Sequence, residues 1–394
     1  MGPAGSGRRG MRRWMAGQGA SYNRAMQASE AGSVSVPLGE QIRAAIDAAG
    51  GWLPFDRYMA LALYTPGLGY YANARIKLGR MPADGSDFVT APELSPLFGR
   101  TLAAQAAQVL EITESDEVFE FGAGTGALAE SLLDGLAACG HPFVRYTIVE
   151  LSADLRTRQQ ARLARFGDRV QWADRWPEAM HGVVFGNEVL DAMPVQLLHF
   201  DGERWQERGV ALQDGRLVFE DRTSDLAPPH EGLFLPGTVT EIHHQAEAFV
   251  TSLAQHLKQG AAFFIDYGFP EAEYYHLQRH GGTLMCHRAH LADTDPLADA
   301  GEKDITAHVN FTGIALAGQH AGLDVIGYTS QARFLVNCGI APLLEAADLR
   351  QRAMAQKLIT EHEMGELFKV IGFATPGLAF EPIGFSEGDR LHRL

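Results

Sequence analysis

The sequence of 394 residues is short of cysteine, of long apolar runs and of net positive charge, and each shortage excludes a class of protein. Its three cysteines, Cys139, Cys286 and Cys338, are widely spaced and odd in number, which excludes a disulfide framework or a zinc knuckle and is typical of reduced thiols. No run reaches the roughly 18 uninterrupted apolar residues of a membrane span. The formal net charge is −15 at pH 7, so we expect a basic ligand rather than a nucleic-acid backbone.

The remaining composition is ordinary for a soluble enzyme, with 46% hydrophobic and 21% charged residues. A chain of this length can bury one large core or two smaller ones. Residues 1–36 differ from the rest, because they are rich in glycine, alanine and serine and contain no acid before Glu30. We expect this leader to be disordered, as a bacterial extension or a cloning remnant, with a mitochondrial presequence as the alternative. The expected compartment is the bacterial cytoplasm, with the mitochondrial matrix as the alternative.

Residues 37–110 have the pattern of a helical preface and a lid. Residues 37–64 predict two helices separated by Gly50-Gly51. A loop rich in glycine and aromatic residues follows, and a long helix is expected to begin near Ser95-Pro96. Six residues are expected either to close over a ligand or to fill the core beneath the preface: Tyr70, Tyr71, Phe88, Thr90, Pro92 and Glu93.

Residues 111–374 alternate between short apolar runs and helical segments. The runs are β-branched or aromatic and mostly continuous, as in strands of a parallel sheet that is covered on both faces. Right-handed crossovers between them would give an open, doubly wound α/β sheet, with inserted helical elements near 200–258 and 270–330 and a tail at 375–394. The predicted strands are residues 117–121, 143–150, 169–173, 182–188 and 261–268, and the predicted helices are residues 125–138, 152–166 and 244–259.

The motif FEFGAGTGALAE, residues 119–130, joins the first predicted strand of this core to a helix through a glycine-rich turn. Such a turn leaves backbone N–H groups and the positive end of the helix dipole pointing at a ligand. The glycines alone do not identify that ligand, because Gly122, Gly124 and Ala127 also satisfy the loose dinucleotide pattern G-x-G-x-x-G/A.

Acidic residues at the strand ends distinguish between the possible ligands. Glu120 precedes the glycines and Glu150 ends the second strand, at the edge where such sheets bind ligands. Glu120 would repel a pyrophosphate, whereas S-adenosylmethionine carries a sulfonium and an ammonium but no phosphate. We therefore expect S-adenosylmethionine as the cofactor, with Glu150 accepting from both ribose hydroxyls and Asp174 from the adenine amino group. The other expected cofactor contacts are Thr90, Pro92, Glu93, Gly122, Ala123, Gly124, Thr125, Gly126, Leu151 and Asn187.

Each of these acids also has an ordinary structural explanation, as a helix N-cap or a solvated loop residue. That explanation is stronger for Asp174 and Asp191 taken singly than for Glu120 and Glu150, whose positions follow from the sheet topology. No metal is expected, because the four histidines between residues 276 and 290 lack a carboxylate or thiolate to complete a tight zinc set.

Nine motifs follow one another along residues 37–374: GYY (69–71), DFVTAPELSPLFG (87–99), FEFGAGTG (119–126), IVELS (148–152), GNEVLDAMPV (186–195), IDYG (265–268), GTLMCHRAH (282–290), DPLADAGEKDITAHVNF (295–311) and MGELFKV (364–370). Their order resembles the MidA-type family, whose members include a mitochondrial complex I assembly factor that methylates an arginine. The resemblance implies a class I S-adenosylmethionine-dependent methyltransferase fold and, from the mitochondrial members, symmetric dimethylation of an arginine on a complex I subunit. The chain departs from the family at Ala300, at Asn310 and at Cys286 or His287, where proline, aspartate and tyrosine are usual.

The chemistry of methyl transfer from a sulfonium requires a positioned, desolvated nucleophile more than a strong base. A guanidinium stays protonated up to a pKa of roughly 13.8, so its site needs a carboxylate that holds the planar fork. Glu188, on the turn after the fourth strand, is expected to be that clamp, and Asn187 could instead contact the transferring nitrogen. Asp191 and Asp266 are weaker candidates behind them. His308 could lie near the acceptor or be an ordinary loop histidine.

The acidic composition, the position of Glu188 and the resemblance to the MidA-type family together lead us to expect a protein arginine N-methyltransferase that acts on a partner protein, without a nucleic-acid partner. Two alternatives stay open at this point. One is a methyltransferase for a small amine or carboxylate metabolite, and the other is an assembly chaperone that keeps the cofactor fold only to bind a partner. The intact glycine turn and the acids count against the chaperone.

Overall fold

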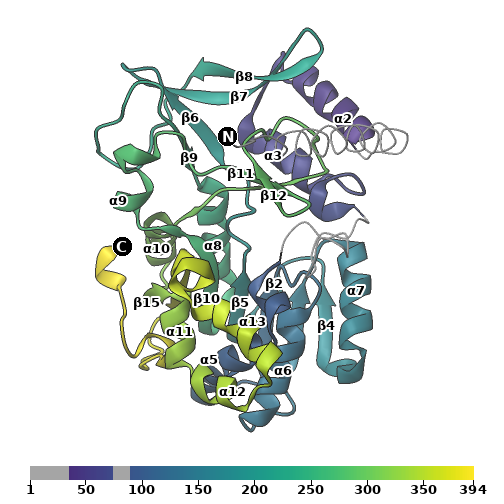
Figure 1. Cartoon of the computed structure of the whole chain (residues 1–394), viewed down its shortest axis with the longest axis vertical. Coiled ribbons are helices and arrows are strands. Elements are labelled where there is room, and N and C mark those ends of the chain that lie inside the picture. Colours follow the sequence, from purple (N-terminus) through teal and green to yellow (C-terminus); the bar gives the residue numbers. More distant parts are fainter. Residues whose placement is uncertain (1–34, 74–88) are drawn as a thin grey trace, which may run out of the picture.

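The computed structural model describes residues 35–73 and 89–394 of the chain. The expected leader lies outside the described residues except for its last two positions, and Phe88 also lies outside them. The chain forms a central α/β sheet with its helices, and a second, smaller sheet lies beside it together with the two helices of the preface (Figure 1).

The central sheet has the strand order β15-β16-β10-β5-β2-β3-β4. The strands from β10 to β4 are parallel, whereas β16 is antiparallel to both of its neighbours. Each of the predicted strands is present and the α/β fold class is confirmed, while β15 and β16, which the sequence pattern did not predict, make the sheet mixed. The strands are β2 (Glu117–Phe121), β3 (Arg145–Val149), β4 (Val170–Ala173), β5 (Met180–Asn187), β10 (Leu257–Phe269), β15 (Asp324–Ser330) and β16 (Phe368–Ala374), with the short β14 (Val309–Asn310) beside β10.

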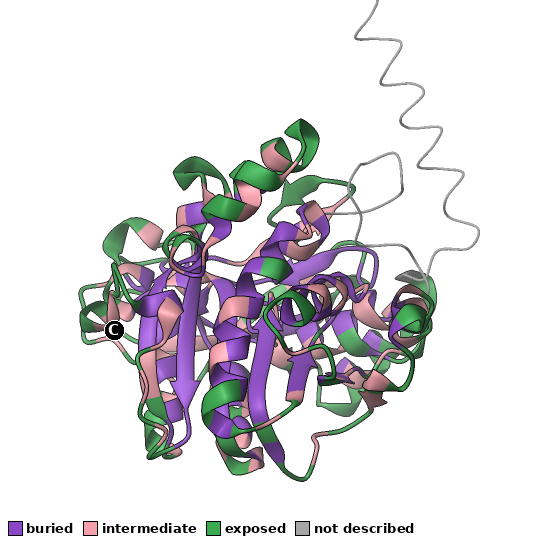
Figure 2. Ribbon diagram, turned by 90° about the horizontal axis from the view of Figure 1, so that it is seen from below, coloured by how far each residue is buried: buried purple, intermediate pink, exposed green. Residues whose placement is uncertain are grey.

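Helices cover both faces of the central sheet. Phe263 and Phe264 are adjacent in β10 and both are fully buried, because one packs in the core on one face and the other in the core on the opposite face. The helices on the Phe263 face are α5 (Leu97–Thr113), α6 (Ala127–Ala138), α7 (Ala153–Leu163), α11 (Gln331–Asn337), α12 (Ile340–Ala346) and α13 (Leu349–Ile359). The helices on the Phe264 face are α8 (His244–His256) and α10 (Phe311–His320). Figure 2 shows the buried strands between helices whose exposed residues face outward.

Polar side chains set the beginnings of several core helices. Helix α5 begins at Leu97, after Pro96, and the hydroxyl of Ser95 accepts from the Leu97 N–H at 3.2 Å, close to the predicted start. Ser152 caps α7 by accepting from Leu155 at 3.4 Å. Asn310 caps α10 in the same way. Helices α7 and α10 therefore begin shortly after the ends of β3 and β14.

The second sheet unites the preface with the segment that follows β5. Strand β1 (Trp52–Pro54) pairs antiparallel with β7 (Trp205–Gln213), although more than a hundred residues separate them in the sequence. Helices α2 (Ser35–Ala48) and α3 (Phe55–Tyr64) pack on this sheet in a separate apolar core, and they confirm the two predicted helices of the preface. The other strands are β6 (Gln196–Phe200), β8 (Arg216–Thr223) and β9 (Val239–Ile242).

The insertions contain helices, as expected, but also strands that the sequence pattern did not predict. Strands β7 and β8 form a hairpin whose turn residues, Asp214 and Gly215, both have positive φ angles, of 50° and 75°. An Asp-Gly pair with these angles is typical of a two-residue type I′ turn. A third sheet consists of β11 (Met285–Arg288), β12 (Leu291–Asp293) and β13 (Asp304–Thr306).

The remaining elements are short. The helices α4 (Ala91–Leu94) and α9 (Glu271–Tyr274) have one turn each, and further helical turns are Tyr70–Ala72, Ala164–Arg169, Leu277–Arg279, Glu361–Gly365, Ile383–Phe385 and Leu391–Arg393. None of the helices within residues 35–73 and 89–394 is long and apolar enough to cross a membrane.

Candidate active site

A cavity of about 1640 Å³ opens beyond the carboxyl ends of β2, β3 and β5. This is the edge at which open α/β sheets bind their ligands. Its glycine-turn end is lined by Gly122–Thr125, Glu150 and Trp176, and its acidic end by Glu188 and Asp191. Helix α3 and the segment between β13 and β14 complete the acidic end.

The glycine turn has a backbone that only glycine adopts readily. Gly122, Gly124 and Gly126 have φ angles of 66°, 53° and 84°. A Cβ atom at Gly122 would lie 2.9 Å from a methyl carbon of Val189, so a larger residue would also collide with the turn after β5. Helix α6 starts directly after Gly126, so its N-terminal N–H groups face this region. The turn is therefore shaped for close approach of a ligand to the backbone.

Glu150, at the end of β3, is held by two donors while it lines the cavity. Its Oε1 accepts from the Ser152 N–H at 2.8 Å, and its Oε2 accepts from Nε2 of Gln159 at 3.0 Å. Burial raises the pKa of Glu150, and these hydrogen bonds oppose the rise. Each carboxylate oxygen keeps a second lone pair, so Glu150 is still able to accept from hydroxyl groups of a ligand.

Glu120 is not the charged carboxylate that its sequence position suggested. It is 2% exposed, and its Oε2 accepts from the Tyr146 hydroxyl at 2.7 Å. Burial raises the pKa of Glu120 to about 8, and the nearby Glu150 adds to the rise. The carboxyl is thus mostly neutral at pH 7, and the expected repulsion of a pyrophosphate by a charged Glu120 is not supported.

The acidic end contains two carboxyls that are close enough to affect each other. Glu188 has a φ angle of 53°, and its Oε1 accepts from Nδ2 of Asn187 at 2.9 Å. Burial raises the pKa of Glu188 to about 8, with repulsion from Asp191 as the next cause. Burial also raises the pKa of Asp191 to about 6, against a hydrogen bond from Tyr267. Both groups are therefore able to change protonation state near neutral pH.

Three buried polar atoms of this end have no partner among the described residues: Oδ1 of Asn187, Oδ1 of Asp191 and Nδ1 of His308. Asn187 and Asp191 are 8% and 5% exposed, and all three residues line the cavity. Burial lowers the pKa of His308 to about 4, so its ring is neutral at pH 7. Buried polar atoms normally have partners, so these atoms mark the place where a ligand with hydrogen-bond donors fits.

Asp266 supports the turn that carries these groups. Its Oδ2 accepts from three successive backbone N–H groups, those of Val189, Leu190 and Asp191, at 3.2, 2.9 and 3.2 Å. Burial raises the pKa of Asp266, and Asp191 and Glu188 add to the rise while the backbone donors oppose it. Asp266 does not line the cavity. Asp266 thus lies behind the turn rather than in the cavity, and its proposed role as a supporting residue stays a prediction.

Aromatic side chains form the opposite wall of the acidic end. The rings of Tyr64 and Tyr71 stack with centroids 5.7 Å apart, and both residues line the cavity. The Tyr71 hydroxyl donates to Oδ1 of Asp304 at 2.8 Å. Tyr70, in contrast, is 1% exposed and does not line the cavity, so within the predicted lid Tyr71 faces the site and Tyr70 fills the core.

Comparison with known proteins identifies the family. A family model described as "Putative S-adenosyl-L-methionine-dependent methyltransferase" matches residues 101–329. The chain belongs to this methyltransferase family. A crystal structure from Burkholderia thailandensis, a "likely methyl transferase" bound to S-adenosyl-homocysteine, is 50% identical, with a TM-score of 0.88 over 92% of this chain and 97% of that chain. The resemblance to the MidA-type family is thereby confirmed.

More distant relatives carry a more specific name. A mitochondrial protein of Drosophila melanogaster named protein arginine methyltransferase NDUFAF7 homolog is 28% identical over 78% of this chain and 76% of its own length. The relative of the same name from Caenorhabditis elegans is 25% identical over 85% of this chain and 87% of its own length.

The cofactor of this methyltransferase is S-adenosyl-L-methionine. The glycine-turn end fits it, because the positive-φ turn exposes backbone donors and Glu150 lies where ribose hydroxyls are expected. Of the predicted cofactor contacts, the cavity brings together Thr90, Pro92, Glu93, Glu120, Gly122, Ala123, Gly124, Thr125, Glu150, Leu151 and Asn187. Gly126 lies behind the turn, at the start of α6, and does not line the methyltransferase cavity.

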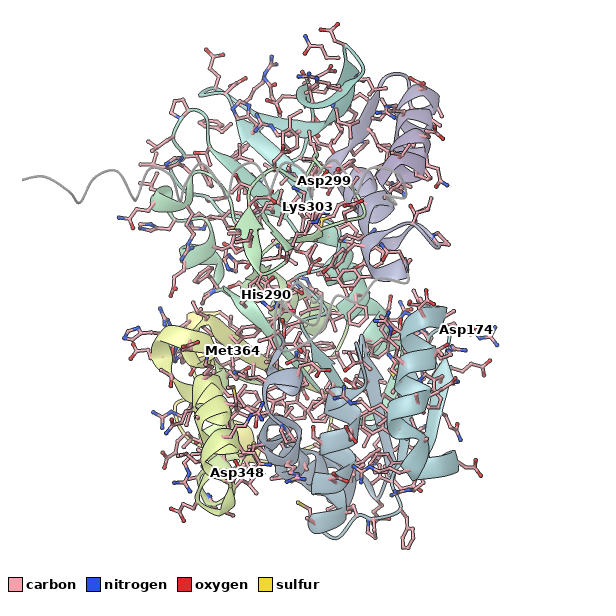
Figure 3. All side chains as sticks on the ribbon, turned by 45° about the vertical axis from the view of Figure 1, so that its right-hand side comes forward. Asp174, His290, Asp299, Lys303, Asp348 and Met364 are labelled. Carbon is pink, nitrogen blue, oxygen red and sulfur yellow. The ribbon has the colours of Figure 1, made fainter. Side chains whose placement is uncertain are left out.

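Asp174 is an expected contact that the structure places on the surface and outside the cavity. Its side chain is exposed and does not line the cavity, and it lies at the outer edge of the molecule in Figure 3. The next two residues, Arg175 and Trp176, line the methyltransferase cavity instead. The expected contact of Asp174 with adenine is therefore not supported, because the chain turns inward only after it.

Sequence reasoning missed the side chains that hold the site from behind. Gln159 and Arg162 of α7 are three residues apart and face the glycine turn, where Gln159 donates to the Gly124 carbonyl at 2.9 Å. Arg162 donates to Glu93 at 2.8 Å and also to the Thr125 hydroxyl. The spacing of the two residues on one helix face was the available signal. This spacing alone does not predict contact with the glycine turn, because only the folded chain places α7 beside that turn.

Within residues 35–73 and 89–394, no group of three or more histidine, cysteine or acidic side chains is arranged to hold a metal ion. His287 and His308 both line the methyltransferase cavity. His308 packs edge-on against Tyr267 and Phe269 and belongs to the acidic end.

Proposed function

We propose that this methyltransferase modifies a guanidinium nitrogen of an arginine side chain in a partner protein, with Glu188 holding the guanidinium. A respiratory complex I subunit, which the family resemblance implies, is the first partner to test. The relatives named as protein arginine methyltransferases support the acceptor class. The acidic end of the cavity supports it independently.

The observation that carries this proposal is the set of unused acceptors at the acidic end. Glu188 and Asp191 make no ion pair with any described residue, and Oδ1 of Asp191 and Oδ1 of Asn187 have no partner there. Buried carboxyls without a cation are costly, and a guanidinium supplies both a positive charge and five N–H donors. An arginine side chain would supply both this charge and these donors, whereas an acidic acceptor would add to the repulsion at the acidic end.

The protein's own part of the chemistry follows from these groups. The cofactor supplies an electrophilic methyl carbon attached to a sulfonium, so the nucleophilic nitrogen has to be aligned and its proton has to be removed. Glu188 holds two nitrogens of the planar fork and leaves the third free to attack. As the N–C bond forms and the S–C bond of the sulfonium breaks to leave S-adenosyl-homocysteine, Oδ1 of Asp191 would accept the proton that this nitrogen loses. Tyr64 and Tyr71 keep water from the site.

Incubating a lysate of cells that lack the protein with purified enzyme and labelled cofactor tests this proposal. Methylated arginine in a protein, identified by mass spectrometry, is the expected result. Glu188→Gln should lower this activity by roughly 10²-fold while cofactor binding survives, as expected for a group that acts mainly in the transition state. Asp174→Asn is the matched control, because Asp174 is exposed and outside the cavity. Label found only on lysine, carboxylates or small molecules would overturn the arginine assignment.

A further inference from the structure

The segment between β13 and β14, residues 307–308, belongs to the acidic end of the cavity. The N–H of Ala307 donates to the backbone carbonyl of Asp191 at 3.0 Å, so the segment lies against the turn that carries Asp191. His308 lines the cavity, and its ring packs edge-on against Tyr267, which lines the cavity as well. His308 therefore lies at the end of the cavity that the proposed function assigns to the acceptor.

Two hydrogen bonds hold the backbone of His308. Its N–H donates to Oγ1 of Thr283 at 3.1 Å, and its carbonyl accepts from Nε2 of His243 at 2.8 Å. Both partners are buried, with Thr283 8% and His243 3% exposed. The ring of His308 packs against the rings of Tyr267 and Phe269, with centroids 5.1 and 5.2 Å away. The imidazole is thus held in place before a ligand binds, which lowers the entropy cost of a contact with it.

One polar atom of this ring is unused. Nδ1 of His308 is buried and has no partner among residues 35–73 and 89–394. Burial lowers the pKa of His308 to about 4, and the positive charges of Arg279 and Lys369 add to the fall, so the ring is neutral at pH 7. A neutral imidazole has one donor and one acceptor nitrogen, and a proton on Nε2 leaves Nδ1 as the acceptor. A ligand N–H is therefore the partner that this atom lacks.

The number of unused acceptors at the acidic end matches the donors of a guanidinium, which carries five N–H groups. In the proposed function Glu188 accepts from two of them and Asp191 from a third. The other two unpartnered atoms of this end are Oδ1 of Asn187 and Nδ1 of His308. The amide orientation of Asn187 is set by its Nδ2, which donates to Glu188 at 2.9 Å and leaves Oδ1 as the acceptor. One N–H is thus available for each of these two atoms.

We propose that His308 is an acceptor-binding residue, with Nδ1 of its ring accepting an N–H of the target guanidinium. The proposal rests on the proposed function for the chemical class of this ligand. An ammonium has only three donors and would leave two of the buried acceptors unpaired, so His308 favours arginine over lysine.

In the transfer step the N–C bond forms, the S–C bond of the sulfonium breaks, and Asp191 takes the proton. His308 takes no part in these changes, because its contact with the guanidinium is made equally before and during the step. Such a contact contributes to binding of the acceptor and leaves the rate of the bound complex unchanged. His308 should therefore affect KM for the acceptor, whereas Glu188 should affect kcat.

Initial rates with labelled cofactor and increasing amounts of a lysate from cells that lack the protein test this split. His308→Ala should raise the apparent KM for the acceptor about tenfold or more, as expected for one lost hydrogen bond to a charged group. Its kcat and its affinity for S-adenosyl-homocysteine, measured by calorimetry, should stay close to wild type. An unchanged KM in folded His308→Ala overturns the proposal, as does a loss of cofactor affinity that accounts for the whole effect.

Two further variants identify the atom that makes the contact. The side-chain oxygen of asparagine is able to occupy the position of Nδ1, and that of glutamine, one carbon further out, the position of Nε2. His308→Asn should therefore restore most of the affinity for the acceptor, and His308→Gln should be as weak as His308→Ala. The reverse order would overturn the assignment to Nδ1. If His308→Ala does not fold, the comparison between the asparagine and glutamine variants decides the question alone.

His320→Ala is the matched control, because His320 is exposed at the end of α10 and lies outside the cavity. It should have the KM of wild type, and an equal rise in this variant would overturn the proposal. Methylated arginine formed with the same KM by wild type and His308→Ala would refute the role of His308 and keep the arginine assignment. A raised KM that asparagine restores, with label on a small amine instead, would refute the arginine assignment and keep the contact of His308 with the acceptor.

Discussion

The side-chain amide of Gln159 donates to Oε2 of Glu150 at 3.0 Å and to the carbonyl of Gly124 at 2.9 Å, so one side chain holds two parts of the cofactor half. Its own Oε1 accepts from the indole N–H of Trp172 at 2.9 Å. Gln159 is fully buried, and all of its polar atoms are used in this way. The hydrogen bonds of Gln159 therefore hold the Glu150 carboxylate, which is expected to face the ribose, in a fixed position relative to the glycine turn.

Replacing Gln159 with methionine should weaken cofactor binding about tenfold. Methionine has a similar size but no donor, so Glu150 loses one hydrogen bond, a loss of about 1.5–3 kcal/mol for a charged acceptor. Calorimetric titration with S-adenosylmethionine measures the change. The neighbouring Gln160 is exposed, so Gln160→Met is the control and should bind normally. Equal affinities of the two variants would show that Gln159 is not needed to position Glu150.

Replacing Glu150 with alanine should weaken both S-adenosylmethionine and S-adenosyl-homocysteine by at least about tenfold, because both ribose hydrogen bonds are lost. The two ligands share the ribose, so their affinities should fall together. The Ser152 N–H also loses its acceptor, so the melting temperature has to be measured alongside. Full affinity in the folded variant would reduce Glu150 to a structural role.

The use of an arginine acceptor should increase with pH between about 6 and 8. Glu188 has a raised pKa of about 8 and Asp191 one of about 6, so both carboxyls are neutral below this range and charged above it. Only the charged forms attract a guanidinium, and the pH dependence of kcat/KM reports the free enzyme. Glu188→Gln should remove the upper limb of this profile. A rate that falls as the pH rises to 8 would contradict the assignment.

Glu120 should make the folded protein less stable as the pH rises. Its folded pKa of about 8 lies above its ordinary value of 4.5, so the folded state holds a proton that the unfolded state releases. The stabilising contribution of this proton is complete below about 4.5 and is lost as the pH rises to about 8. Urea unfolding at pH 5 and pH 8.5 should show a smaller loss of stability in Glu120→Gln than in wild type. The Tyr146 hydroxyl donates to Glu120 in wild type and still has the side-chain amide oxygen as an acceptor in Glu120→Gln, so this hydrogen bond does not distinguish the two proteins.

Local sequence was enough to predict the strands of the central sheet from β2 to β10, the glycine turn between β2 and α6, and the acids at the strand ends. These features follow from local causes. Apolar runs form buried strands, a left-handed turn requires glycine, and adjacent parallel strands bring their carboxyl ends to one edge. For this reason the sequence pattern assigns Glu120, Glu150 and Glu188 to one edge of the sheet, and all three line the same cavity.

The Asp-Gly turn between β7 and β8 is a further local signal, but it indicates only the hairpin that contains it. The rest of the second sheet has no such signal, because β1 and β7 are brought together from distant parts of the chain. Strand pairing at that distance depends on how the preface packs, which no short window of sequence contains.

The role and charge of individual side chains, in contrast, depended on tertiary contacts. These contacts place Asp174 in solvent and Asp266 beneath the turn after β5. They also bring Gln159 and Arg162 of α7 against the glycine turn. They also make the carboxyl of Glu120 mostly neutral at pH 7, because its pKa is raised by burial and by the neighbouring Glu150 after β3. Contacts and solvation depend on all the elements that surround a residue, and those elements meet only when the chain has folded.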